Sequence, residues 1–324
     1  MKKLFFISAV AIVALASAVS CQKETSVSED SVQVTLTVEA PVELGTKATT
    51  IADGLKATEL LFAVYNTDKT QHIESLDDAV VTKVGEKSWE VKMTLVKSYT
   101  YHIFFWAQTA NSTYYSFDKD KGTITVDYSG AANDDNRDAF CKLFTFTVPT
   151  TGSEFAPADP VVLTRPFAQI NLCASDYEHI TELELELEMT SKITVSGVST
   201  KYNFLTGTVS EATAVDFTLA QIPAELGETI EVNKTDYAYV GMNYILAPEN
   251  TYDAEGKVVI NRSEVNDMVV TFAYNGSNVA IDVPNVPYQR NFRTNLVGNF
   301  FTGEASIDVI IDNSFLTPDE IVNY

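Results

Sequence analysis

Apolar and polar residues alternate along much of the chain, and a period of two is typical of β-strands with one buried face. In the segment 32–40, VQVTLTVEA, one face consists of Val32, Val34, Leu36, Val38 and Ala40. In the segment 88–96, SWEVKMTLV, one face consists of Trp89, Val91, Met93 and Leu95. Both segments are therefore predicted to be half-buried strands.

The sharpest alternation is ELELELEM, residues 182–189, in which leucine and glutamate take turns. A helix would scatter the leucines around its axis, whereas a strand collects them on one face. The glutamates admit two interpretations, a paired-carboxylate active site or the charged outer face of a strand. We predict the outer face, because charged side chains there also protect a sheet from edge-to-edge aggregation.

Short apolar segments separated by turn residues continue along the chain. Further strands are expected at Leu60–Tyr65, Tyr99–Ala107, Thr123–Tyr128, Leu143–Val148, Gln169–Ala174, Lys192–Val195, Asp216–Leu219, Tyr239–Ala247, Lys257–Ile260 and Ser306–Ile311. Asn275-Gly276 stands between two apolar segments and favours a type I′ hairpin turn. No long stretch has helical spacing. The sequence therefore predicts an all-β protein built from β-sandwiches.

Prolines concentrate in one place, since four of the ten lie between residues 149 and 166. Proline removes a donor from a β-ladder, so this segment is interpreted as a linker. A chain of 324 residues is long enough for two domains. We predict an N-terminal domain at 32–160 and a C-terminal domain at 161–324.

The first residues show a different pattern. Lys2 and Lys3 precede the sixteen-residue apolar run Leu4–Val19, which ends among small residues. A membrane-spanning helix needs roughly 20 apolar residues. A basic start, a short apolar middle and a small-residue end are typical of a secretory signal peptide, predicted at residues 1–20 in preference to a buried core helix.

Ala18-Val19-Ser20-Cys21 resembles the lipobox of bacterial lipoproteins. The resemblance implies that Cys21 becomes the first mature residue and carries the lipid, and that residues 21–31 form a tether. Acyl chains contribute about 0.8 kcal/mol per buried CH₂, and stable anchoring takes more than one chain. Ordinary signal-peptide cleavage, with Cys21 incidental, is the alternative.

The formal net charge of −22 excludes nucleic acid as a partner, because the chain would repel a polyanion. Cys141 and Cys173 could pair in an oxidising compartment or remain buried free thiols, and the sequence leaves both open. Their spacing does not fit a metal site.

Motifs of catalysis are missing. The sequence has no nucleophile elbow, HExxH motif, phosphate loop or dinucleotide fingerprint. The isolated residues His72, His102 and His179 are interpreted as structural. DKDKG at 118–122 and NDDNRD at 133–138 resemble calcium-binding loops only weakly. We interpret the first as a turn and the second as a solvated loop. We therefore expect no enzyme activity, no cofactor and no metal.

The aromatics of 106–117 could stack on sugar rings, although most aromatics in such a chain belong to the core.

Two stretches resemble a known family. They are LTRPFAQINL, residues 163–172, and VPYQRNFRTNLVGNFFTG, residues 286–303. With the lipobox and the all-β pattern, they resemble the Mfa-like fimbrillins, the type V pilus subunits of Bacteroidota. The motif residues are Arg165, Arg290, Asn291, Thr294, Asn295 and Gly298. The resemblance implies that these residues build the scaffold; from the residues alone they suit a linker exit and a polar loop that leads into a strand.

The family resemblance implies two tandem transthyretin-like β-sandwich domains and export as an outer-membrane lipoprotein. It also implies proteolysis after a basic residue, which frees the first strand and leaves a groove for a strand of a neighbouring subunit. Here the first strand would be VQVTLTVEAPV, residues 32–42, and the cut would follow Lys47; the family's best-known protease is arginine-specific, and the first arginine here is Arg137. The donor row would be Ile307, Val309 and Ile311.

The sequence thus predicts a fimbrillin-like surface lipoprotein, a structural or adhesive subunit of type V pili. Its expected partners are other pilin subunits, the outer membrane through the lipid anchor, and a host protein or glycan. The alternative is a monomeric surface lipoprotein that binds a glycan or a host protein.

Overall fold

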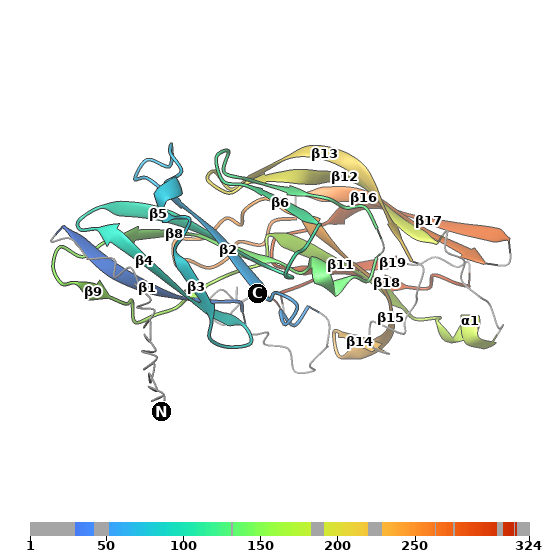
Figure 1. The fold of residues 1–324 in the computed structure, drawn as a ribbon. Coiled ribbons are helices and arrows are strands. Elements are labelled where there is room, and N and C mark those ends of the chain that lie inside the picture. The colour runs from blue at the N-terminus through green and yellow to red at the C-terminus, as the bar shows by residue number, and fades with distance from the viewer. Residues whose placement is uncertain are drawn as a thin grey trace, which may run out of the picture.

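The computed structural model describes residues 30–41, 52–130, 132–182, 191–219, 229–262, 264–274, 276–302, 307–313 and 315. Within these residues the protein is nearly all strand, and the strands pair into three sheets (Figure 1). The short helical elements are η1 (Glu74–Leu76), η2 (Asp135–Arg137) and α1 (Glu178–Glu182). This architecture confirms the predicted all-β class.

The first sheet contains the N-terminal strand. Its members are β1 (Ser31–Glu39), β3 (Val80–Lys83), β4 (Ser88–Val96), β9 (Glu154–Phe155) and β10 (Val161–Val162). The strand order is β10-β1-β4-β3, and β9 also pairs with β1. β1 runs antiparallel to β4 and parallel to β9 and β10. β1 is therefore an interior strand of this sheet.

The second sheet lies between the other two. It consists of β2 (Glu59–Tyr65), β5 (Thr100–Gln108) and β8 (Phe140–Thr147), with β5 in the middle. Ile103 and Phe105 of β5 belong to the core shared with β1, whereas Phe104 and Trp106 belong to the core shared with the third sheet. Both faces of β5 are thus buried, which explains its nearly continuous apolar sequence.

The third sheet carries most of the C-terminal half of the chain. Its members are β6 (Tyr115–Asp118), β7 (Thr123–Val126), β11 (Phe167–Ala174), β12 (Lys192–Asn203), β13 (Thr208–Thr218), β14 (Thr229–Val232), β15 (Thr235–Leu246), β16 (Val265–Tyr274), β17 (Ser277–Pro287), β18 (Arg293–Gly298) and β19 (Ile307–Asp312). The main order is β17-β16-β12-β15-β11-β18-β19. β7 pairs with β12, so the β6–β7 hairpin extends from the N-terminal half onto this sheet.

Nine of the ten additional strand segments predicted from the sequence coincide with strands or parts of strands. The prediction for Lys257–Ile260 is wrong, because Val258 forms only an isolated bridge with Tyr252. The hairpin between β16 and β17 is present, with Tyr274 opposite Ser277, although Asn275 lies outside the described residues.

The proline-rich segment 149–166 is more than a linker, because it contains β9 and β10, which pair with β1. The division of the chain into an N-terminal domain at 32–160 and a C-terminal domain at 161–324 remains a prediction. Several other predictions concern residues that the structure does not describe: the signal peptide 1–20, Cys21, Lys47 and the ELELELEM segment beyond Glu182. In the described ranges, no helix is both long and apolar enough to cross a bilayer.

Candidate functional site

The slot that β1 occupies is the first part of the candidate site. The inner row of β1 is almost inaccessible to solvent: Val32, Val34, Leu36 and Val38 are 0% exposed and Ala40 is 3% exposed. All nine residues of β1 pair with β4, from Ser31 opposite Val96 to Glu39 opposite Ser88. β1 therefore fills a groove with an apolar floor and hydrogen-bonding partners along both rims.

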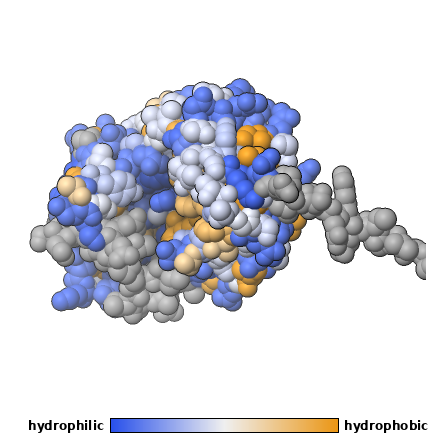
Figure 2. Space-filling view, turned by 90° about the vertical axis from the view of Figure 1, so that its left-hand side faces the viewer, coloured by the Kyte–Doolittle hydropathy of each residue, from blue (hydrophilic) through white to orange (hydrophobic). Residues whose placement is uncertain are grey.

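The second rim of this slot is short and irregular. Gln33 N–H donates to the Ser153 carbonyl at 2.9 Å, and Leu163 N–H donates to the Glu39 carbonyl at 2.8 Å. Beside β9 a cavity of about 450 Å³ opens over the outer face of β1, next to Phe155. Figure 2 views the end of the molecule that carries β1 and β9, and it shows hydrophobic residues in a hollow between hydrophilic rims. β1 is thus held firmly by β4 on one side and only by two short strands on the other.

The predicted donor strand is β19, the edge strand of the third sheet, which pairs antiparallel with β18. Two of the three residues of its apolar row are docked on their own chain. Ile307 packs against the large core, Ile311 packs against Phe292 and Val258, and Val309 is 36% exposed. The three residues therefore do not share one buried face in this state.

The two stretches that carry the family resemblance lie side by side. β11 and β18 pair in parallel over six positions, from Gln169 opposite Arg293 to Ala174 opposite Gly298. At the centre of this pairing Asn171 Nδ2 donates to Asn295 Oδ1 at 2.8 Å, and both residues are 0% exposed. Segments more than a hundred residues apart in sequence thus form one buried polar seam.

The remaining residues of the second motif shape the chain at the two ends of β18. Thr294 Oγ1 donates to the Pro287 carbonyl at 2.8 Å. Asn291 has a positive φ of 62°, a conformation that asparagine tolerates better than most residues. The Gly298 carbonyl accepts from the Ser175 N–H at 2.8 Å. Their described contacts are internal to the chain.

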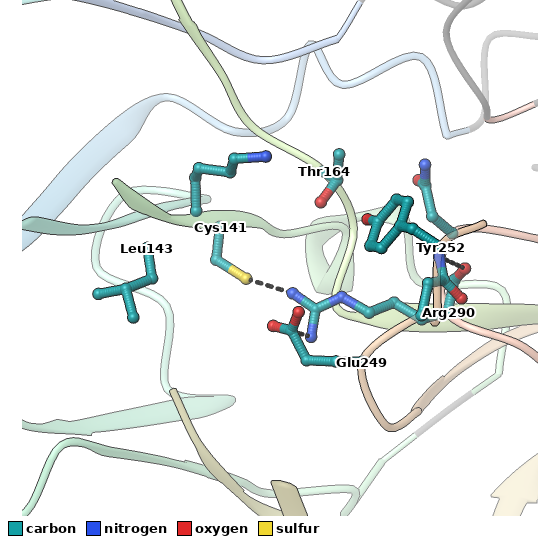
Figure 3. Close-up of a pocket in the computed structure, with 9 residues that line it drawn as sticks. Cys141, Leu143, Thr164, Glu249, Tyr252 and Arg290 are labelled. Atoms are coloured by element: carbon teal, nitrogen blue, oxygen red, sulfur yellow. Dashed lines mark hydrogen bonds and ion pairs between the residues drawn. The ribbon is translucent and has the colours of Figure 1, made fainter. Parts of the chain in front are cut away.

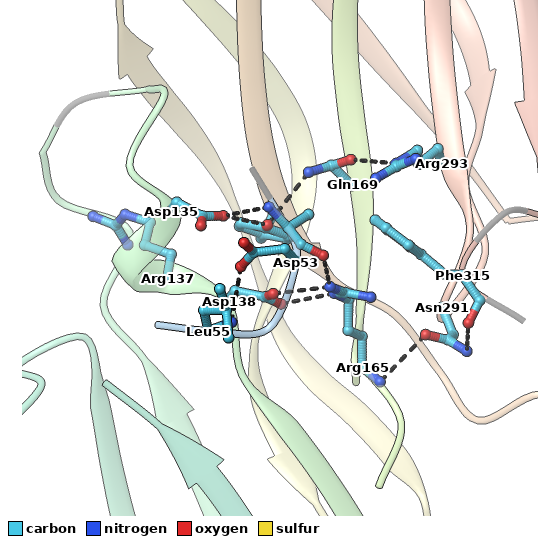
Figure 4. A network of polar contacts seen from close by, with 12 residues as sticks. Asp53, Leu55, Asp135, Arg137, Asp138, Arg165, Gln169, Asn291, Arg293 and Phe315 are labelled. Carbon is cyan, nitrogen blue, oxygen red and sulfur yellow. Dashed lines mark hydrogen bonds and ion pairs between the residues drawn. The ribbon is translucent and has the colours of Figure 1, made fainter. Parts of the chain in front are cut away.

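Arg165 lies at the centre of a buried polar network (Figure 4). Its Nε and Nη2 contact the two carboxylate oxygens of Asp138 at 2.8 and 2.9 Å, and the two side chains are 1% and 0% exposed. Arg165 Nη2 also donates to the Ala52 carbonyl. The guanidinium lies 4.6 Å from the Phe140 ring centroid and 3.9 Å from that of Phe315. This bidentate geometry is the strongest form of an arginine–carboxylate contact.

A second carboxyl group stands beside this ion pair. Asp135 Oδ1 accepts from Ala52 N–H at 2.8 Å and from Tyr244 Oη at 3.0 Å. Burial and the neighbouring Asp138 charge raise the pKa of Asp135 to about 6. Within the described part of the chain, Asp135 Oδ2 is buried without a hydrogen-bond partner, a position that suits a protonated oxygen.

Arg290 lines a polar cavity of about 210 Å³ (Figure 3). Its Nη2 contacts Cys141 Sγ at 3.0 Å, and its Nη1 lies 3.2 Å from Glu249 Oε1. Burial raises the pKa of the Cys141 thiol to about 11, so the sulfur is a protonated thiol rather than a nucleophile. Tyr202 Oη donates to Glu249 at 2.6 Å. Arg290 is therefore occupied by groups of its own chain.

Two of the three histidines, which the sequence predicts to be structural, have partners within the chain. His72 contacts Asp77 at 2.9 Å and Asp120 at 3.2 Å, and His102 contacts the Thr145 hydroxyl at 2.9 Å. Cys141 and Cys173 are buried free thiols. Across the described ranges, no group of three or more His, Cys, Asp or Glu residues is placed to hold a metal ion.

The aromatics of 106–117 do not form an exposed platform for sugar rings. Trp106 is 0% exposed, and Tyr115 and Phe117 pack against the large core. Arg137 covers the Tyr114 ring with its guanidinium 3.9 Å from the ring centroid. The general expectation that most aromatics belong to the core holds for this segment.

The sequence points to Arg165 but not to its partners. Asp138 falls in the NDDNRD segment, where loop carboxylates suggest a solvated turn. Ala52 and Phe315 carry no signal, because a backbone carbonyl and a single aromatic near the end of a chain have no distinguishing pattern. Only the fold brings the three residues to one guanidinium.

Within the described residues the chain is thus an all-β protein of three sheets, and a comparison with protein families assigns it to one of them. Residues 24–323 match the model described as "Family of unknown function (DUF6562)", and the chain belongs to this family. Among curated proteins, no match to the chain was found.

Solved structures with a similar course of the chain include fimbrial proteins. The tip fimbrial protein Mfa3 from Porphyromonas gingivalis is 12% identical, with a TM-score of 0.48, covering 87% of this chain and 99% of that one. A protein assigned to cell adhesion from Bacteroides uniformis is 12% identical, with a TM-score of 0.47 and coverages of 86% and 98%. A fimbrial assembly protein from Parabacteroides distasonis is 12% identical, with a TM-score of 0.42 and coverages of 88% and 97%.

Proposed function

We propose that this protein is a fimbrillin-like subunit of the cell surface, held at the outer membrane by a lipid on Cys21 and assembled into type V pili by strand exchange. In this scheme cleavage after Lys47 releases β1, and the C-terminal strand of a second copy takes its place. The proposal agrees with the names of the fimbrial structures above, but its support comes from the residues of β1 and β19.

The observation that carries the proposal is the form of the β1 slot. β1 is an interior strand with a fully buried apolar row, so its departure would expose an apolar groove and the unpaired edge of β4. An open edge of this kind is a template for strand addition by another chain. In β19, Ile307, Val309 and Ile311 alternate with Asp308 and Ile310. Three of the four inner positions of β1 can then be filled by residues of similar size.

Assembly can be tested with a residue whose environment differs between the two states. Val309 is 36% exposed in the closed subunit, so Val309→Asp should fold normally. In the slot the same side chain would be buried, where an unpaired carboxylate costs several kcal/mol. After cleavage at Lys47 we expect polymers from the unchanged protein and none from Val309→Asp, measured by size-exclusion chromatography and electron microscopy.

Asp308→Ala is the matched control, because Asp308 is exposed in the closed subunit and lies on the opposite face of the strand. It should polymerise like the unchanged protein. If Val309→Asp polymerises as well as Asp308→Ala, β19 is not the donor. If the folded, cleaved, unchanged protein stays monomeric at high concentration, the monomeric surface lipoprotein is the better account.

The anchor has its own test. Cys21→Ala should leave the protein without lipid and release it from membranes into the soluble fraction after a high-salt wash. The physical reason is that the acyl chains supply the membrane affinity. Mass spectrometry of the mature N-terminus checks the lipid directly, and a Cys21→Ala protein that still sediments with outer membranes would contradict the proposed anchor.

A further inference from the structure

The segment that follows the proposed cut at Lys47 and the segment that follows β19 meet at one buried residue, Arg165. Ala52 begins the described chain after residue 51, and Phe315 follows β19 near the other end. Both contact Arg165: its Nη2 donates to the Ala52 carbonyl, and its guanidinium lies 3.9 Å from the centroid of the Phe315 ring. Phe315 is 3% exposed and Ala52 is 0% exposed. Contacts this well buried imply that both segments dock tightly.

The contacts of Ala52 and Phe315 with Arg165 are part of a closed ring of interactions (Figure 4). From Phe315 the ring continues through Arg293, whose guanidinium lies 4.2 Å from the Phe315 centroid and whose Nε donates to Gln169 Oε1 at 2.9 Å. Gln169 Nε2 in turn donates to Tyr244 Oη at 3.3 Å. Tyr244 and the Ala52 N–H share Asp135 Oδ1, which closes the ring.

A second link fixes the backbone on the same side. Asn291 Nδ2 donates to the Phe315 carbonyl at 3.1 Å, and Asn291 Oδ1 accepts from the Arg165 N–H at 3.4 Å. Phe315 is thus held by its ring between two guanidiniums and by its carbonyl. A ring between cations is favoured by cation–π attraction, and more so when it is desolvated. The segment that follows β19 is therefore anchored at Phe315.

We propose that Arg165 is a clasp that couples the two segments, so that β19 stays docked on β18 only while Ala52 keeps its hydrogen bonds to Arg165 and Asp135. Loss of the Ala52 carbonyl would leave the guanidinium with one fewer acceptor, although Asp138 still holds it. The buried N–H without its acceptor weakens the packing of the guanidinium on Phe315, which loosens the end of β19. If the proposed function holds, on which this consequence rests, cleavage after Lys47 leaves Ala52 as the fifth residue of the shortened chain, and the clasp ties release of the donor strand to the loosening of this new end. Uncut subunits would then keep their donor strand closed.

The coupling is tested on the uncut, full-length monomer by hydrogen exchange, so polymer formation does not enter the result. Ala52 has a φ of 60°, which proline cannot adopt, and proline also removes the N–H that Asp135 accepts. Ala52→Pro should speed exchange of the β19 amides at least tenfold, although Ala52 is not part of β19 or β18. Ala52→Gly keeps both backbone hydrogen bonds and suits a positive φ, so its β19 amides should exchange as in the unchanged protein.

Exchange in β16, an interior strand elsewhere in the same sheet, reports global destabilisation. Unchanged β19 exchange in Ala52→Pro, or equal acceleration in β19 and β16, would overturn the coupling. Because coupling is reciprocal, Phe315→Ala should speed exchange of the Ala52 amide as well as of β19, and this variant decides the matter if Ala52→Pro does not fold. The double variant Ala52→Pro/Phe315→Ala gives a last check. If its acceleration of β19 exchange equals the product of the accelerations in the two single variants, the two effects are independent, which contradicts the clasp.

Discussion

Replacement of Asp138 by alanine should lower the free energy of unfolding by about 3–5 kcal/mol, because it leaves the Arg165 guanidinium buried without its counter-ion. The pair is almost completely sealed from water, with side chains 1% and 0% exposed. The Ala52 carbonyl and the two rings beside Arg165 cannot replace the carboxylate, since none of them carries a negative charge. Urea denaturation followed by circular dichroism measures the change.

Asp216→Ala is the matched control for the Asp138 variant. Asp216 also pairs with a cation, at 2.7 Å from Lys192 Nζ, but their side chains are 50% and 38% exposed. Exposed pairs of this kind contribute roughly 0–1 kcal/mol. Equal losses of stability in Asp138→Ala and Asp216→Ala would mean that burial of the first pair does not matter, which contradicts the expected result. A double change of Arg165 and Asp138 to apolar residues should cost less than Asp138→Ala alone, because it leaves no buried charge.

The strands that the sequence predicts best are those with one buried face. β1 and β4 each present an unbroken alternation, because one side packs on β2, β5 and β8 while the other meets polar groups or solvent. β5 is also predicted, although its buried positions run on without alternation. Length and aromatic content identify it as a strand, but only the structure explains why both of its faces are apolar.

The pairing of strands that lie far apart in the chain cannot be predicted from the local sequence. β9 and β10 have two residues each, too few for any period, and the neighbouring prolines indicate a turn rather than a strand. Their strand conformation comes from the edge of β1 and not from local preference. The β6–β7 hairpin poses the same difficulty, since its second strand is predicted locally but its place beside β12 is a tertiary result.

The residues of the candidate site also differ in how well the sequence predicts them. The family resemblance singles out Arg165 and Asn291, and the structure brings them into contact. The chain has 44 acidic residues, and nothing in the sequence selects Asp138 among them as the partner of Arg165. Such a partner depends on which loop the fold carries to the arginine. Individual polar residues can thus be predicted from sequence motifs, whereas their pairing requires the arrangement of the sheets.

The second large effect is expected from Asp135→Asn, which should raise the free energy of unfolding at pH 8 by about 2–3 kcal/mol. The pKa of Asp135 is raised to about 6 in the folded protein, with burial as the main cause and the charge of Asp138 as the next. A carboxyl with a raised pKa holds its proton more tightly in the folded than in the unfolded chain. Its contribution to stability is therefore present at low pH and is lost as the pH rises through 6. Asparagine keeps an oxygen for Ala52 N–H and carries no charge at any pH.

The gain from Asp135→Asn should consequently shrink in acid. At pH 5 the folded unchanged protein keeps most of its Asp135 protonated, so the advantage of the variant should be smaller than at pH 8 by about 1.4 kcal/mol, a factor of ten in the unfolding equilibrium. Urea denaturation at pH 5 and pH 8 measures both values and stays above the sequence pI of about 4.4. Asp216→Asn is the control of opposite sign, because hydrogen bonds from Lys192 and Thr194 lower the pKa of Asp216. That variant should lose stability at pH 8. An Asp135→Asn gain that is the same at both pH values would show that its cause is not the carboxylate charge.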